Sequence, residues 1–207
     1  MLTILGCALP DICDKSLEHY CKTGMEHLAE RLDIKQIRHL DKFARTGKTL
    51  RMRAARILAR LMLISRLPDS ARLCTDANGI PFPENKNLAA GFSYTRQASF
   101  CALYEGEEPC RRPGIDAEAW GERDDNVFAN LAQLKSWLKL EAILKARGTG
   151  LAGAKKDPKT GLLVANVQLD AWRWKYLAFP GHIVCIAARA EQELKPASRW
   201  MQAANIL

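Results

Sequence analysis

The fold is decided by the stretch Leu131-Ala-Gln-Leu-Lys-Ser-Trp-Leu-Lys-Leu-Glu-Ala-Ile-Leu-Lys-Ala-Arg147. Its pattern predicts one long helix, and Gly148, which follows at once, is typical of a glycine that caps the end of a helix. Trp137, Glu141 and Lys145 are spaced four residues apart, so they share one face of that helix. An exposed Glu–Lys ion pair would show the same spacing, and such a pair contributes only about 0.3–0.5 kcal/mol.

Upstream of this helix, the segment Gly114-Ile-Asp-Ala-Glu118 predicts a short strand. Alternate residues of a strand point to the same face, so Asp116 and Glu118 lie on one side of it. If that strand packs against the helix, both carboxylates meet Glu141. Three clustered carboxylates repel one another unless a cation neutralises them, and Mg²⁺ is the natural oxygen-seeking cation, with Mn²⁺ as the alternative. We therefore expect Asp116, Glu118 and Glu141 to hold a divalent metal ion, with Lys145 beside it.

The rest of the chain divides into further helices and strands. Helices are predicted over Lys15–Leu32 and Thr49–Ser65, where apolar residues recur at helical spacing. Six more segments predict strands, because apolar residues run through them and turn residues bound them. These strands are Leu2–Leu9, Leu88–Thr95, Ser99–Tyr104, Leu162–Val167, Ala171–Ala178 and His182–Ala188. We expect loops at Asp76–Gly79 and Lys155–Thr160, and a helical C-terminal tail.

Both halves of the chain run from helix to hairpin, although no internal repeat is visible residue by residue. We therefore expect an α+β fold in which two similar α+β subdomains form a pseudo-two-fold pair. Each subdomain would consist of a small, mainly antiparallel sheet with one long helix packed on it. The polar stretch Glu105–Pro113 marks the boundary. Residues 1–108 would then form the N-terminal subdomain and residues 109–207 the C-terminal subdomain.

The composition of the chain indicates which class of partner and which cellular compartment to expect. The chain has 207 residues, and 31 Lys and Arg against 23 Asp and Glu give a formal net charge of +8. That charge favours an anionic partner, which includes nucleotides, acidic proteins and nucleic acids. The seven cysteines form neither a CxxC pair nor a regular framework, which fits the reducing cytoplasm. No apolar run approaches the roughly 20 residues that a membrane span needs, so no membrane partner is expected.

Together, the strand and helix motifs resemble those of a known family. Gly114–Glu118 is similar to the GID-x-E signature of the 4′-phosphopantetheinyl transferases of the surfactin-synthetase type, and Trp137–Lys145 is similar to their W-x-x-K-E-A-x-x-K signature. Weaker echoes of the family's earlier motifs occur at Gly79–Phe82 and Phe92–Thr95. The resemblance covers roughly residues 50–190. The joint order and separation of the motifs, with an arginine-rich helix upstream, make it specific.

The resemblance implies an activity and a set of roles. Members of this family transfer the 4′-phosphopantetheine group of coenzyme A to a serine of an apo acyl or peptidyl carrier protein, with release of adenosine 3′,5′-bisphosphate. By analogy, Asp116, Glu118 and Glu141 would hold Mg²⁺. Glu141 would also help to deprotonate the serine, and Lys145 would stabilise the departing phosphate and contact coenzyme A.

The resemblance also implies a binding site for coenzyme A and a protein partner. Arg53 and Arg56 would hold the adenosine phosphates, and Ser93 and Tyr94 stand where the family has a serine and a histidine that contacts a coenzyme A phosphate. The protein partner would be an acidic carrier protein, steered by the positive charge of this chain. We expect the chain to act as a monomer.

The match with the family is incomplete at three positions. Tyr94 donates one hydrogen bond but lacks the positive charge of the family's histidine. Ile80 occupies the position of the lysine of the GKP element, and Leu140 that of the lysine before the glutamate. Each missing charge-assisted bond is worth about 1.5–3 kcal/mol, so we expect weaker coenzyme A binding unless neighbouring cations substitute. All three metal ligands are retained.

Two alternative functions follow from the same residues. A catalytically degenerate homologue would bind carrier proteins without modifying them. A nucleic-acid-binding protein would use Arg53, Arg56 and Arg60, which share one face of the predicted helix Thr49–Ser65. No nucleic-acid motif is present, however, and that function leaves the three carboxylates unexplained, so no nucleic-acid partner is expected. The four histidines, including His39, show no zinc-site spacing and are assigned no role.

Overall fold

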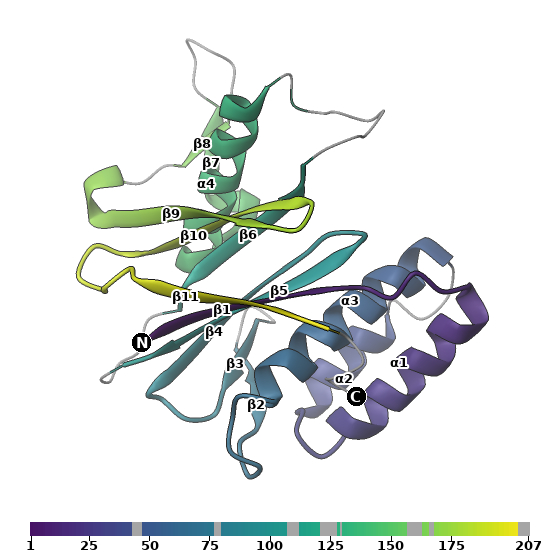
Figure 1. Cartoon of the computed structure of the whole chain (residues 1–207). Coiled ribbons are helices and arrows are strands. Elements are labelled where there is room, and N and C mark those ends of the chain that lie inside the picture. The colour runs from purple at the N-terminus through teal and green to yellow at the C-terminus, as the bar shows by residue number, and fades with distance from the viewer. Residues whose placement is uncertain are drawn as a thin grey trace.

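The computed structural model describes residues 1–42, 47–76, 80–106, 112–120, 128, 130–156, 163–165 and 168–202. These residues form an α+β fold built in layers around two sheets (Figure 1). Three helices cover one face of the first sheet, and the second sheet packs on its other face. A single long helix covers the outer face of the second sheet.

The first half of the chain supplies the three helices and most of the first sheet. Strands β1, β4 and β5 of this half belong to the first sheet, in which β1 and β4 lie on either side of β5. Between α3 and β4 in the chain, β2 and β3 form a small separate hairpin. The elements are β1 (Leu2–Ala8), α1 (Asp14–Leu28), α2 (Ile34–Asp41), α3 (Gly47–Ile64), β2 (Leu73–Thr75), β3 (Pro81–Pro83), β4 (Leu88–Tyr94) and β5 (Ala98–Glu105).

The second half supplies the second sheet, the long helix on it, and one strand that returns to the first sheet. Two single 3₁₀ turns, Gly150–Gly153 and Leu169–Ala171, connect its elements. The elements are β6 (Gly114–Ala119), α4 (Leu131–Arg147), β7 (Ala154–Lys156), β8 (Leu163–Ala165), β9 (Trp172–Phe179), β10 (His182–Arg189) and β11 (Pro196–Met201).

The two halves repeat one topology. Strand order is β1-β5-β4 in the first half and β6-β10-β9 in the second, and every neighbouring pair within these triplets is antiparallel. In each half the first strand precedes the long helix and the other two strands follow it as a hairpin, and α3 and α4 pack on their own sheets. The expected α+β fold of two similar halves is therefore present. The boundary at 108/109 lies outside the described residues.

The prediction of a helical C-terminal tail was wrong, because residues Pro196–Met201 form the strand β11. Strand β11 pairs in parallel with β1, with Leu2 opposite Pro196, so this strand of the second half extends the sheet of the first half. The free edge of β1 offers unpaired backbone groups that a strand satisfies and a helix does not. Trp200 also packs against the aromatic rings of Phe100 and Phe179, which tie the two halves together.

Side chains alternate along the strands and so divide the core between the layers. On β5, Cys101 and Leu103 face the helices, whereas Phe100 and Ala102 face the second sheet. The same alternation on β10 sends Val184 toward the first sheet and Cys185 toward α4. Burial on both faces explains why these strands read as nearly continuous apolar runs.

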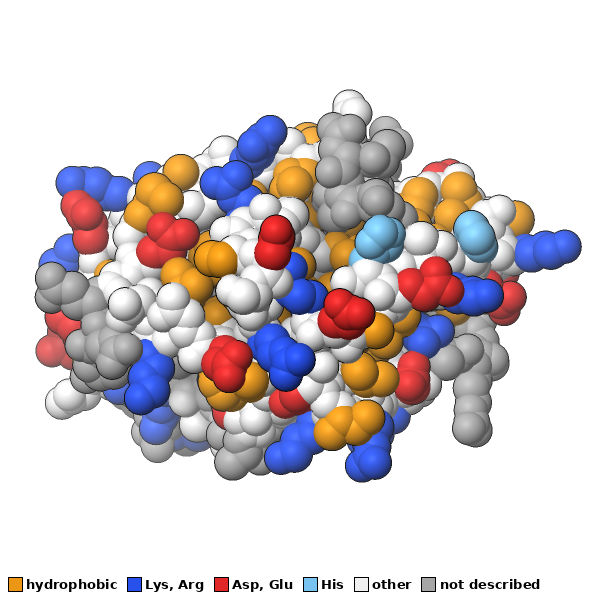
Figure 2. Space-filling view, turned by 90° about the horizontal axis from the view of Figure 1, so that it is seen from below, with side chains coloured by type: hydrophobic (Ala, Val, Ile, Leu, Met, Phe, Trp, Pro, Cys, Tyr) orange, Lys and Arg blue, Asp and Glu red, His pale blue; other side chains and the backbone are white. Residues whose placement is uncertain are grey.

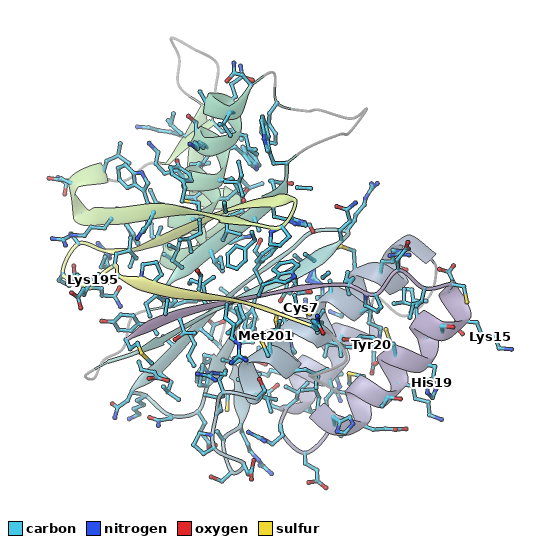
Figure 3. All side chains as sticks on the ribbon, viewed as in Figure 1. Cys7, Lys15, His19, Tyr20, Lys195 and Met201 are labelled. Carbon is cyan, nitrogen blue, oxygen red and sulfur yellow. The ribbon has the colours of Figure 1, made fainter. Side chains whose placement is uncertain are left out.

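Helix α1 illustrates how a helix with one apolar face covers the first sheet. Cys7, Tyr20 and Met201 lie together where β1, α1 and β11 meet, and Lys15 and His19 project from the outer face of α1 (Figure 3). Cys7 and Tyr20 are buried, and burial raises the pKa of the Cys7 thiol to about 11. This end of the fold is therefore a packed core.

Several predicted boundaries needed correction. The predicted helix Lys15–Leu32 stops at Leu28, because Asp33 begins a new helix, α2, by accepting a hydrogen bond from the Gln36 amide at 2.7 Å. The residues Lys155 and Lys156, expected in a loop, belong to β7, which pairs with β8. The β2–β3 hairpin was not predicted, since its prolines indicated a break. Residues 77–79, 157–162 and 166–167 of the predicted loops and strand lie outside the described residues.

The other predicted elements are confirmed with shifts of one or two residues at their ends. Helix α4 spans the predicted Leu131–Arg147, and Gly148 ends it in the left-handed conformation with φ 76°. Within the described part of the chain, no helix is both long enough and apolar enough to cross a membrane.

Candidate active site

A pocket of about 220 Å³ lies between the two halves, where β4 at the edge of the first sheet approaches β6 at the edge of the second. We call it the central pocket. Its walls are mostly apolar and include Phe92, Pro113 and Ile115. Positively charged side chains enter it from several elements of both halves. They are Arg56 and Arg60 of α3, Arg112 before β6, and Lys145 of α4, with His39 of α2 beside them.

Two glycines allow the elements around the pocket to approach closely. A Cβ on Gly114 would lie 1.8 Å from the carbonyl oxygen of Ala142, so β6 and α4 can pack at this distance only without a side chain there. A Cβ on Gly91 would lie 2.4 Å from the Pro113 carbonyl oxygen, at the contact between β4 and the start of β6. The glycine of the GID-x-E segment thus brings the strand that carries Asp116 against the helix that carries Glu141.

Asp116 is the centre of a hydrogen-bonded group at the edge of the pocket. Its side chain is only 9% exposed, and its Oδ1 accepts hydrogen bonds from Lys145 Nζ at 2.6 Å and from Ser93 Oγ at 3.1 Å. Ser93 Oγ in turn accepts one from the Ala117 amide at 3.1 Å. Residues from β4, β6 and α4 therefore meet at one carboxylate, which joins the two halves.

Glu141 and Glu118 flank this group. Glu141 lies half-buried on α4, and its pKa is raised by burial first and by the negative charge of Asp116 second, while Lys145 acts to lower it. The two carboxylates therefore feel each other's charge. Glu118 follows Asp116 by two residues on β6, so it lies on the same face of the strand.

The three carboxylates provide the oxygen donors that Mg²⁺ prefers. Burial and, second to it, the charge of Asp116 raise the pKa of Glu141, so a cation bound beside these two carboxylates would favour the ionised form of Glu141. In the segments that the structure describes, no three carboxylate, thiol or imidazole groups lie close enough together to form a metal site by themselves. Mg²⁺ commonly keeps several waters and takes its remaining ligands from substrate phosphates, so the donor chemistry suits a site that is shared with a bound phosphate compound.

Some of the residues predicted to bind coenzyme A line the central pocket, and others do not. Arg56, Tyr94 and Lys145 line the central pocket, and the guanidinium carbon of Arg56 lies 4.9 Å from the centre of the Tyr94 ring. Ser93 is buried beside Asp116. Arg53 instead donates to Asp41 Oδ1 at 2.7 Å and does not line this pocket. Gly79, part of the weaker motif at Gly79–Phe82, lies outside the described residues.

Three basic residues of the pocket are not part of the site that the sequence predicts. The sequence marks Arg60 only as part of a basic helix face, and it gives no role to His39 or Arg112. The signal for Arg60 was its spacing of four residues from Arg56, which places both on one face of α3. No local pattern marks His39 or Arg112, because only the fold brings α2 and the segment before β6 to the same pocket.

Burial lowers the pKa of several of these groups, and neighbouring cations add to the effect at His39 and Arg56. Burial, followed by the charges of Arg56 and Arg60, lowers the pKa of His39. Burial also lowers the pKa of Arg56 and of Arg112, although Asp76 acts to raise that of Arg112. Partly desolvated cations that face one pocket are stabilised by an anion placed among them.

Arg53, Arg56 and Arg60 of α3 do not form the exposed basic face that the sequence suggested. Arg60 is 1% exposed, and Arg53 is paired with Asp41. On the face shown in Figure 2, Lys and Arg side chains are interspersed with Asp and Glu and do not form one continuous basic patch. The formal charge of +8 therefore gives no single basic surface there.

No protein-family model matches this chain, and no curated protein matches it.

Proposed function

We propose that the protein is a 4′-phosphopantetheinyl transferase, which moves the 4′-phosphopantetheine group of coenzyme A to a serine of an apo acyl or peptidyl carrier protein. The observation that carries the proposal is the central pocket. It combines apolar walls with Arg56, Arg60, Arg112 and Lys145, and Lys145 connects it to Asp116, whose charge acts on Glu141. An apolar cleft with several cations suits a nucleotide that carries more than one phosphate. The motifs around Asp116 and Glu141 resemble those of this enzyme family.

The proposed reaction is one displacement at phosphorus. The serine oxygen of the carrier forms a bond to the β-phosphorus of coenzyme A, and the bond from that phosphorus to the oxygen of adenosine 3′,5′-bisphosphate breaks. The serine proton leaves to a base, and the leaving group carries away the bonding electron pair. The protein must therefore supply a base, positive charge near the leaving phosphate, and a fixed orientation of both reactants.

Glu141 suits the role of base. Its raised pKa brings a carboxylate closer to the pH at which it works, which improves its capacity to accept a proton. Lys145, whose Nζ lies 2.6 Å from Asp116, places positive charge where the leaving phosphate would sit. Asp116, Glu118 and Glu141 would hold Mg²⁺, which neutralises charge on the pyrophosphate when bound.

A second function is favoured by one observation. The neutral side chains of Ile80 and Tyr94 line the same pocket, at positions where the family has cations. A homologue that binds carrier proteins without modifying them would tolerate that loss. The two functions differ in whether the carrier gains mass.

The decisive experiment is to incubate the protein with coenzyme A, Mg²⁺ and apo carrier proteins of the acyl and peptidyl types, and to measure each carrier by intact-protein mass spectrometry. We expect one carrier to gain the mass of a single phosphopantetheine group. Binding of a carrier in pull-down without any gain in mass, across all types, would favour the non-catalytic function.

The matched variant is Glu141→Gln, which keeps the size of the side chain and removes its charge. We expect transfer to fall by about 10²–10⁴-fold, which is the usual contribution of a general base. Lys139→Gln on the same helix is the control, because Lys139 lies over the ring of Trp174 on another face. Equal transfer by the wild type and the Glu141→Gln variant would exclude this role for Glu141.

A further inference from the structure

The most unusual side chain of the central pocket is Arg60, a guanidinium that is only 1% exposed. Its Nε and Nη2 donate to Gln36 Oε1 at 3.0 and 2.6 Å. Its Nη1 donates to the Arg56 carbonyl oxygen at 2.9 Å and reaches the Tyr94 hydroxyl at 3.4 Å. All of these acceptors are neutral. The guanidinium carbon also lies 5.6 Å from the centre of the Phe92 ring. A buried positive charge is normally paired with a negative one, and none of these described contacts of Arg60 carries a negative charge.

A chain of hydrogen bonds holds Arg60 in this place. Gln36 is fully buried and presents its amide oxygen to Arg60, while its Nε2 donates to Thr75 Oγ1 at 3.0 Å. Thr75 Oγ1 donates to Asp33 Oδ1 at 2.8 Å, and the same Asp33 oxygen caps helix α2. A neutral amide, and not a carboxylate, orients Arg60. The guanidinium is therefore held in place without an ion pair to any described residue, and its positive charge can act on a ligand.

Arg112 brings a second positive charge to the pocket from the opposite half of the chain. Its Nη2 lies 3.5 Å from Asp76 Oδ2, a distance at which an ion pair is loose. The same atom lies 3.3 Å from the position that a Cβ on Gly148 would occupy, which places it at the C-terminal end of α4. Arg60 and Arg112 thus reach the pocket from the two halves, and the neutral Ile80 and Tyr94 also line it.

We propose that Arg60 and Arg112 together bind a phosphate monoester of a nucleotide in the central pocket, and that Gln36 is the positioning residue that directs Arg60 toward it. A phosphate monoester carries up to two negative charges and three acceptor oxygens, which matches guanidinium groups that converge from different walls. Apolar residues such as Phe92 and Pro113 provide the surface for the nucleoside. The inference rests on the proposed function for the identity of the nucleotide, which is coenzyme A.

The test is calorimetric titration of the protein with adenosine 3′,5′-bisphosphate, adenosine 5′-monophosphate and adenosine. We expect the bisphosphate to bind most tightly and its affinity to fall with salt. Arg112→Gln should weaken bisphosphate binding at least about tenfold, the loss of one charge-assisted contact. The difference in affinity between bisphosphate and adenosine should shrink accordingly.

Gln36→Glu separates positioning from folding. This variant keeps an acceptor for the two Arg60 hydrogen bonds but places a negative charge beside the guanidinium, so the arginine becomes neutralised from within. We expect the variant to stay folded by circular dichroism, to bind the bisphosphate at least about tenfold more weakly, and to raise the KM for coenzyme A more than it lowers kcat. Arg60→Gln should have a similar effect on binding, and Gln36→Glu keeps the test valid if that variant does not fold.

Arg51→Gln is the control, because Arg51 lies on the same helix but pairs with Asp11 at 3.5 Å, away from the pocket. Unchanged bisphosphate affinity in both Arg112→Gln and Gln36→Glu would overturn the proposal. If the wild type transfers no group to any carrier but these two variants still lose bisphosphate binding, the phosphate site stands and the proposed transferase function fails. If transfer occurs and the variants bind as the wild type does, the phosphate site fails alone.

Discussion

At the scale of single residues, the site depends on charges that the fold forces together. Burial and the neighbouring Asp116 carboxylate raise the pKa of Glu141, and Lys145 offsets part of that effect. Arg60 is the opposite case, a buried cation held by neutral acceptors. Both arrangements cost stability in the absence of a ligand and favour ligands of opposite charge, which is typical of functional sites.

Glu141→Gln should stabilise the metal-free protein at neutral pH. Because the folded-state pKa of Glu141 is raised, its ionised form is less favourable in the folded than in the unfolded chain. The variant should therefore unfold at a higher temperature at pH 7. The gain should disappear as the pH falls below the ordinary value of 4.5, where Glu141 is protonated in both states.

Thermal unfolding followed by circular dichroism, at several pH values and with or without Mg²⁺, measures this effect. Added Mg²⁺ should stabilise the wild type more than the variant, since the variant has lost a carboxylate ligand. A lower unfolding temperature of Glu141→Gln at pH 7 without metal would contradict the like-charge interaction with Asp116.

At the scale of elements, the site requires β6 and α4 to pack more closely than a side chain allows. Gly114 is the point of contact, and its neighbours are backbone atoms of Ala142 and Ala146 that cannot rotate away. The strand thus carries Asp116 past the helix turn that carries Glu141. The helix itself is fixed at its end by Gly148 and at its start by Asn130, whose side chain accepts from the Gln133 amide.

Gly114→Ala should destabilise the protein by about 3 kcal/mol or more, because overpacking against backbone forces the two elements apart. Chemical denaturation measures the change in the free energy of unfolding. Gly181→Ala is the matched control. It introduces the same methyl group at a glycine with φ 65° and no atoms within 4 Å, so it should cost only about 1 kcal/mol of backbone strain. Equal costs for the two variants would contradict the close approach of β6 and α4.

At the scale of the whole molecule, two groups of side chains stand out among the described contacts that hold the halves together. One is the hydrogen-bonded group around Asp116, which Ser93 reaches from the first half. The other is an aromatic cluster in which Trp200 of β11 contacts Phe100 of the first half and Phe179 and His182 of the second. The central pocket lies between the halves, so its shape depends on both joints.

Trp200→Ala should lower the free energy of unfolding by about 3 kcal/mol, the usual cost of removing a large packed aromatic side chain. It should also weaken binding of adenosine 3′,5′-bisphosphate, although Trp200 is not part of the pocket, because the relative position of the halves becomes less fixed. Trp120→Ala is the control, since Trp120 is 42% exposed and its loss should change stability by less than about 1 kcal/mol. Wild-type stability of Trp200→Ala would show that β11 does not join the halves.

The sequence alone determined most of the elements and the group of residues around Asp116. Helix α4, its glycine cap and the strand that precedes it follow from local spacing, because each depends on residues within one or two turns of one another. The α+β fold of two similar halves also followed from the order of these elements. Residue spacing paired Asp116 with Glu118 and Glu141 with Lys145, and the family resemblance joined the two pairs into one predicted site. The contact between Lys145 and Asp116 brings the strand and the helix of that prediction together.

Only the tertiary structure decided which cations face the pocket and which sheet strand β11 joins. Arg53 and Arg60 lie on the same helix, yet Asp41 engages the first and burial beside Gln36 turns the second toward the pocket. Arg112 reaches the pocket because the two halves meet there, and β11 is a strand because β1 offers a free edge. These outcomes depend on contacts between residues far apart in the chain, which no local pattern encodes.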